Sequence, residues 1–170
     1  MMKRTLALLW AAMLMTMTLT GCGGSSSGSA DAGTAADVDL TAVWNEVLAL
    51  ESEWSEEHFG DLAADEELLE SYYPGLKDIP AKQLIVRAPM MSAVVNEFVF
   101  MQCESEEDAA KAAEILQKRA EDQAAGGAWY PESMAAWEKA QVLTEGSYVA
   151  LVASAQFQAE AAEIFTSKFA

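Results

Sequence analysis

The sequence contains very little histidine, and this scarcity excludes several common kinds of active site. His58 is the only histidine, so a Ser-His-Asp triad or a histidine-based zinc site lacks the partners it needs. It follows Glu56 and Glu57, and we expect it at an exposed helix end. A glycine-rich phosphate loop, a CxxC pair and an HExxH motif are also missing. The sequence therefore predicts no catalytic residue, no cofactor and no metal site.

Cysteine is almost as scarce, with Cys22 and Cys103 as the only two. A reactive thiol needs an electropositive setting, whereas Cys103 is followed by Glu104, Glu106 and Glu107. We therefore expect Cys103 to be a small buried residue at the end of a strand and not a nucleophile.

Basic side chains are few, and acidic ones outnumber them strongly. The chain after Cys22 carries 8 basic residues against 27 acidic ones, a net charge near −19. Such a surface repels nucleic-acid phosphates and anionic lipid headgroups, so no nucleic-acid partner is expected. The acidic clusters lack the alternating oxygen ligands and central glycine of a calcium-binding EF-hand loop. They are typical of helix starts and solvated faces.

The N-terminus has the layout of an export signal. Lys3 and Arg4 precede an uncharged apolar segment from Thr5 to Leu19, which ends in the small residues Thr20 and Gly21. A membrane-spanning helix needs about 20 apolar residues, and this segment is shorter. The pattern therefore favours a cleavable secretory signal over a permanent span.

The segment Leu19-Thr20-Gly21-Cys22 resembles the lipobox of bacterial lipoproteins. The resemblance implies that the Cys22 thiol receives a diacylglycerol group and that cleavage occurs just before it. Two acyl chains hold a protein stably, whereas one holds it marginally. The alternatives are an ordinary signal peptide or a membrane span that contains a cysteine by chance. The resemblance implies that the lipid on Cys22 anchors the protein in the cell membrane, facing outside the cytoplasm, and leaves Cys103 without a disulfide partner.

This layout divides the chain into three parts. Residues 1–21 are the expected signal peptide, residues 22–38 the lipidated cysteine and a linker, and residues 39–170 a single globular domain. The linker is rich in Gly, Ser and Ala and has no large apolar side chain before Val38. A flexible segment of about 16 residues spans roughly 20–25 Å, enough to clear the lipid headgroups.

The domain is predicted to have an α+β fold. Apolar residues at helical spacing from Leu40 to Trp54 indicate an amphipathic helix with Asp39 as its N-cap, and a shorter helix follows over 65–72. From residue 84 the order is ββα(α)ββα, which favours an antiparallel sheet of about four strands. The strands are expected at 84–87, 94–103, 142–144 and 148–152, and the helices from Ser105 to Gly126, over 131–139 and over 157–169. The strand over 94–103 is apolar on both sides, so either the first helix or a second subunit is expected to cover its outer face.

Four short segments carry a further resemblance. They read Ala88-Pro89-Met90-Met91, Asn96-Glu97-Phe98, Trp129-Tyr130-Pro131 and Gly146-Ser147-Tyr148-Val149. Together they resemble a family of small lipoproteins from gram-positive bacteria that is classed as a domain of unknown function. The resemblance extends from Leu40 to Phe169. It implies an extracytoplasmic lipoprotein of a single-membrane bacterium, and it implies no activity.

Glu97 is the one acidic residue within an apolar strand. Alternation places it on the same face as Val95 and Val99, where a covered carboxylate needs a partner. The favoured interpretation is a structural ion pair with Arg87 of the preceding strand. The alternative is a general acid or a ligand contact.

Two loop segments carry apolar bulk in positions that favour exposure. Methionine and aromatic side chains are enriched at contact surfaces, so Met90, Met91, Trp129 and Tyr130 are candidate binding residues. The alternative is that they cap the ends of the hydrophobic core.

These observations favour a non-catalytic binding or accessory module at the cell surface, with a protein or cell-envelope partner. An enzyme acting on the envelope or wall through carboxylates such as Glu97 is the alternative. A solute receptor for a transporter ranks last, because about 130 residues are too few for the usual two-lobed receptor.

Overall fold

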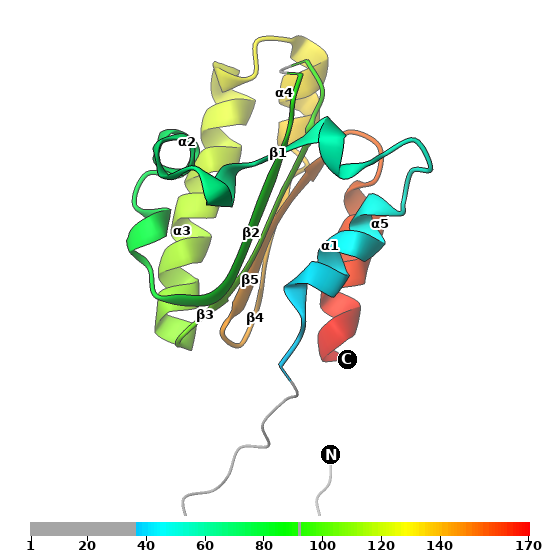
Figure 1. Cartoon of the computed structure of the whole chain (residues 1–170). Helices are drawn as coiled ribbons and strands as arrows, with labels where there is room; N and C mark the ends of the chain where they lie inside the picture. The colour runs from blue at the N-terminus through cyan, green and yellow to red at the C-terminus, as the bar shows by residue number, and fades with distance from the viewer. Residues whose placement is uncertain (1–36, 92) are drawn as a thin grey trace, which may run out of the picture. The chain divides into compact units, whose positions relative to one another are not determined.

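The computed structural model describes residues 37–91 and 93–170 (Figure 1). The expected signal peptide, Cys22 and nearly all of the linker lie outside the described residues. Within those residues, no helix combines the length and the apolar character needed to cross a membrane.

The centre of the domain is a five-stranded antiparallel sheet with the strand order β1-β2-β3-β5-β4. The predicted antiparallel sheet is confirmed: β2 pairs with β3, β4 pairs with β5, and the inner strands β3 and β5 pair with each other. One edge strand, β1, was not predicted from the sequence. The strands are β1 (Phe59–Asp61), β2 (Ala81–Pro89), β3 (Asn96–Cys103), β4 (Gln141–Glu145) and β5 (Tyr148–Ser154).

The described chain contains five α-helices, which confirms the α+β class. Asp39 caps the first helix as predicted, since its carboxylate accepts from the N–H groups of Thr41 and Ala42. This helix ends at Leu48, so the expected continuation to Trp54 is wrong, and Trp54 lies in the following loop. The helices are α1 (Leu40–Leu48), α2 (Glu66–Tyr72), α3 (Glu106–Asp122), α4 (Pro131–Trp137) and α5 (Gln158–Thr166).

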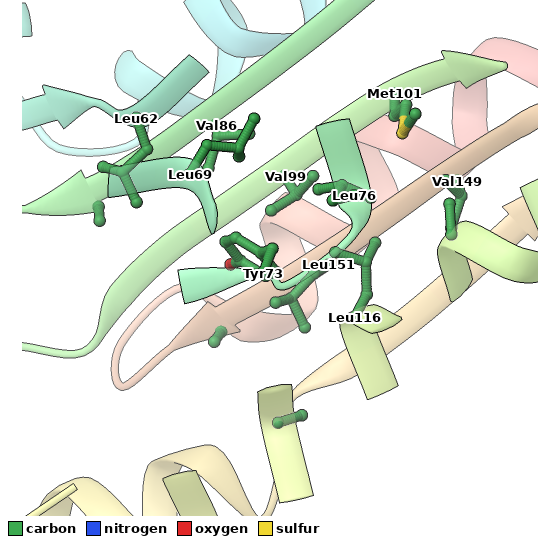
Figure 2. Packing of buried hydrophobic residues seen from close by; sticks show 14 of the residues in the cluster. Leu62, Leu69, Tyr73, Leu76, Val86, Val99, Met101, Leu116, Val149 and Leu151 are labelled. Carbon is green, nitrogen blue, oxygen red and sulfur yellow. The ribbon is translucent and has the colours of Figure 1, made fainter. Parts of the chain in front are cut away.

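Helices cover both faces of the sheet (Figure 1). On one face, Val99 and Leu151 pack with Leu116 of α3, together with residues of α2 and α4 (Figure 2). On the other face, Phe98 and Phe100 pack against α1 and α5. Full burial of one such side chain contributes about 1.5–3 kcal/mol. The outer face of β3 is thus covered by helices of the same chain, α1 among them. Of the two predicted covers, the first helix and a second subunit, the structure shows the first.

The described chain enters the domain at one end of the sheet. Gln102, near the end of β3, donates to the Asp37 carboxylate at 2.8 Å, and the Tyr148 hydroxyl accepts from the Val38 N–H at 2.9 Å. Gln83 of β2 accepts from the N–H of Leu40 at 3.0 Å. The opposite end of the sheet is formed by the start of β3 and the ends of β2 and β5. Since a strand rises about 3.4 Å per residue, Asn96 and Gln102 lie roughly 20 Å apart along β3.

Candidate functional site

A buried ion pair lies near the end of the sheet that faces away from the chain entry. Arg119 of α3 binds Glu97 of β3 with two hydrogen bonds, Nε to Oε1 at 2.9 Å and Nη2 to Oε2 at 3.0 Å. The hydroxyl of Tyr73, just after α2, donates to Glu97 Oε1. The Glu97 side chain is 4% exposed. Both of its oxygens therefore have charged or hydroxyl donors in place of water, as a buried carboxylate requires.

Aromatic rings surround the Arg119 guanidinium. Its central carbon lies 4.5 Å from the ring centroid of Tyr72, 5.5 Å from that of Trp137 and 5.8 Å from that of Tyr73. Such contacts attract the cation electrostatically. Burial acts to lower the pKa of Arg119, but hydrogen bonding to Glu97 and its charge outweigh this and raise it. Burial, followed by the charge of Glu97, raises the pKa of Tyr73 well above its usual 10. Arg119 therefore stays charged, and Tyr73 stays a hydrogen-bond donor, across the physiological pH range.

A pocket of about 450 Å³ opens beside this pair. Its volume is within the range of small-molecule sites, about 300–1,000 Å³. Residues from α2, β2, β3, α3 and α4 contribute to its walls, together with the segment between α3 and α4. The residues that line it are Tyr72, Ala88, Pro89, Val94, Val95, Asn96, Glu97, Arg119, Gln123, Gly127, Ala128, Trp129, Tyr130 and Trp137.

The chain between α3 and α4 brings two aromatic side chains to the pocket. After α3, residues 123–127 form a π-helical turn in which Gly126 has φ +125°, a conformation that strongly favours glycine. A Cβ at Gly127 would lie 2.9 Å from the carbonyl oxygen of Asp122, so this position also needs glycine. Pro131 then starts α4. The two glycines thus turn the chain so that Trp129 and Tyr130 lie in the pocket wall.

The predicted binding residues are all exposed. Trp129 is 91% exposed, Met90 70%, Met91 66% and Tyr130 54%. Side chains so exposed bury little area, so they add little to the core. Among the described residues, Leu68 is the only other large apolar side chain that is exposed.

The methionines belong to the β2–β3 loop itself. They line a second hollow of about 290 Å³ together with Trp54 and Phe59. Pro89, Val94 and Asn96 contribute to both hollows. The structure therefore brings the four predicted binding residues to one end of the domain, around this loop.

The predicted ion pair between Arg87 and Glu97 is wrong. In the register of β2 and β3, Arg87 lies opposite Phe98, so its side chain and that of Glu97 lie on opposite faces of the sheet. Arg87 instead pairs with Asp61 of β1 and stacks over Trp44 of α1. The face predicted for Glu97 is confirmed, because Val95 and Val99 belong to the cluster under α3.

His58 and Cys103 have the surroundings predicted for them. His58 is exposed at the end of a short 3₁₀ helix, Glu56–His58, where its Nδ1 accepts from the N–H of Ser55 at 3.1 Å. Cys103 is fully buried at the end of β3. Burial, with a smaller effect of Asp108, raises the pKa of its thiol to about 11. A thiol with this pKa is protonated at neutral pH and is a poor nucleophile. In the described part of the chain, no group of three or more His, Cys, Asp and Glu residues is placed to hold a metal ion.

Sequence reasoning missed Arg119, Tyr72, Tyr73 and Trp137 as members of the site. A signal for Arg119 was present. It lies three residues after Leu116 and directly before Ala120, both on the buried stripe of α3, so a charged side chain there needs a partner on the sheet. Tyr73 gives no comparable signal, because it lies just after its helix and its partner is 24 residues away.

Comparisons with known proteins give one match. A family model described as "Domain of unknown function (DUF4358)" matches residues 56–154, more than half of the chain. The matched segment begins before β1 and ends with β5, so it contains the ion pair, the pocket beside it and the four exposed side chains. It excludes α1, α5 and Trp54, which lines the second hollow. It is also shorter than the expected resemblance from Leu40 to Phe169. No curated protein and no solved structure matches the chain.

Proposed function

We propose that this chain, which belongs to the family described as Domain of unknown function (DUF4358), is a lipid-anchored binding module outside the cytoplasmic membrane. The anchor is the diacylglycerol on Cys22, and the binding site is the end of the domain with the two hollows. The ligand is a component of the cell envelope, and the cell is a gram-positive bacterium. The lipobox-like segment supports the location, and the exposed side chains support the binding role.

The observation that carries the proposal is the separation of the two ends of the domain. The chain enters beside Gln102 and Tyr148, at one end of the sheet. Trp129 and Met91 belong to hollows formed around Asn96, at the opposite end. A module tethered through its entry point presents the far end to material beyond the membrane. A tether also raises the effective concentration of the module near that material.

The arrangement of Glu97 favours binding over catalysis. A glycosidase-type mechanism needs two carboxylates across a cleft, and Glu97 is the only acidic residue that lines the pocket. Its carboxylate already accepts three hydrogen bonds from Tyr73 and Arg119, which is the arrangement of a structural ion pair. We therefore assign Glu97 the role of holding Arg119 in place, and we propose no enzymatic activity.

Replacing Cys22 by alanine tests the anchor. The Cys22→Ala chain, expressed in a gram-positive host with radiolabelled palmitate, is expected to lose the label completely because the thioether to diacylglycerol cannot form. The matched control is Cys103→Ala, which removes the buried thiol and is expected to keep the label. A label that persists in Cys22→Ala, or that is absent from the unaltered chain, contradicts lipid anchoring.

A photo-crosslinking residue tests which end of the domain binds. Benzoylphenylalanine at position 129 is expected to give a covalent adduct in living cells, because this side chain is exposed in the wall of the pocket. The matched control is the same residue at position 82, which is also exposed but lies at the entry end of the sheet. Adducts are read as mass shifts by gel electrophoresis and mass spectrometry. Equal yields at both positions, or no adduct at 129, contradict the proposed site.

A further inference from the structure

The side chains that line the pocket beside Trp129 have no net charge, although the chain as a whole is strongly acidic. Among its lining residues, Glu97 is the only acid and Arg119 the only base, and they pair with each other. The net charge near −19 after Cys22 repels anionic ligands at long range. A cationic ligand finds no unpaired carboxylate in the pocket, because Glu97 is already bound by Arg119 and Tyr73. The pocket therefore favours an uncharged ligand.

One polar group of the pocket is a hydrogen-bond donor that has no partner among the described residues. Arg119 uses Nε and Nη2 for Glu97, whereas its Nη1 donates to no described residue. Asn96 also lines the pocket, but its side chain lies on the Phe98 face of the sheet, where Oδ1 accepts from Ser154 Oγ at 2.7 Å. A ligand that satisfies the Arg119 donor must present an acceptor oxygen.

Four aromatic side chains contribute to the remaining walls. Trp129 and Tyr130 belong to one part of the wall, and Tyr72 and Trp137 stack on Arg119 in another. The face of an aromatic ring is electronegative and attracts the positively polarised C–H bonds of a saturated ring. A pyranose has such C–H bonds on its faces and oxygens at its edge. We propose that the pocket binds a neutral saccharide, with one ring on Trp129 and an oxygen acceptor at Arg119. This inference rests on the proposed binding function and names its ligand class.

The sheet offers no backbone edge for a peptide at this position. The strands that line the pocket are β2, which pairs with β1 and β3, and β3, which pairs with β2 and β5. A peptide bound by strand addition needs an exposed sheet edge. A saccharide needs only side-chain donors and aromatic faces, and the pocket has both.

Calorimetric titration of the full chain, held in phosphatidylcholine nanodiscs, tests the ligand class. A tetramer of N-acetylglucosamine is the neutral probe, because its acetyl carbonyls are strong acceptors. Tetramers of glucosamine and galacturonic acid are the cationic and anionic controls. We expect saturable binding of the neutral tetramer, and binding weaker by about tenfold or more for each charged tetramer. Trp129→Ala is expected to weaken binding about tenfold or more. Leu68→Ala, which alters an exposed apolar side chain that lines neither hollow, is the matched control and is expected to leave binding unchanged.

Several outcomes overturn the inference. It fails if neither the N-acetylglucosamine tetramer nor neutral tetramers of glucose and mannose bind, or if Trp129→Ala binds as well as the unaltered chain. Equal losses in Trp129→Ala and Leu68→Ala mean that binding does not depend on the pocket, and they overturn the inference as well. Failure of the proposed function itself is distinguished by the photo-crosslinking result. If an adduct forms at position 129 but no saccharide binds, the proposed binding module stands and the saccharide proposal fails. If no adduct forms at 129, both proposals fail.

Discussion

Replacing Arg119 by methionine is expected to lower the free energy of unfolding by about 3–5 kcal/mol, the usual cost of removing one partner of a buried ion pair. Methionine keeps most of the aliphatic length of arginine but removes both hydrogen bonds to Glu97. The Glu97 carboxylate, 4% exposed, then keeps only the hydroxyl of Tyr73. Urea unfolding followed by circular dichroism measures the loss.

Two further variants make this result interpretable. Lys118→Met alters the neighbouring residue of α3, whose ion pair with Asp122 is exposed, and is expected to change stability by less than about 0.5 kcal/mol. The double variant Glu97→Gln with Arg119→Met removes both charges and is expected to regain a large part of the loss. A loss below about 1 kcal/mol in Arg119→Met would mean that water reaches Glu97 from the pocket and replaces the arginine.

The elements with strong local signals were predictable from the sequence. The stripe of Leu40, Val43, Trp44 and Val47 forms the buried side of α1, because helical spacing determines which residues share a face. Ser105 caps α3 as expected, accepting from the N–H of Asp108 at 3.1 Å. In each case residues within a few positions of one another carry the information.

Elements that depend on distant partners were not predictable in this way. Strand β1 has only three residues, one of them Gly60, and it is a strand because it pairs with residues 87–89 of β2. The partner of Glu97 depends on the strand register, which places Arg87 on the opposite face of the sheet, and on the position of α3 across it. The candidate site likewise could be predicted only in part. Its exposed side chains were found from composition and loop position, whereas the buried residues that organise the pocket come from four separate elements.

Two aromatic residues near the far end of the sheet, one buried and one exposed, should differ strongly in how much their truncation lowers the free energy of unfolding. Phe98 is fully buried, with its ring centroid 5.9 Å from that of Trp44, 6.2 Å from that of Trp54 and 6.3 Å from that of Phe59. Phe98→Ala leaves a cavity among these rings and is expected to cost about 3–5 kcal/mol of stability. Trp129 is 91% exposed, so Trp129→Ala is expected to change stability by less than about 0.5 kcal/mol.

This contrast separates the two original interpretations of the loop residues. If Trp129 caps the core, its truncation must lower the urea midpoint as Phe98→Ala does. If Trp129 belongs to a binding surface, truncation leaves the midpoint unchanged and acts on ligand affinity alone. Met91→Ala, also at an exposed position, extends the comparison to the second hollow. Unchanged midpoints in both variants would support the proposed binding surface, because exposed apolar side chains that add no stability otherwise only promote aggregation.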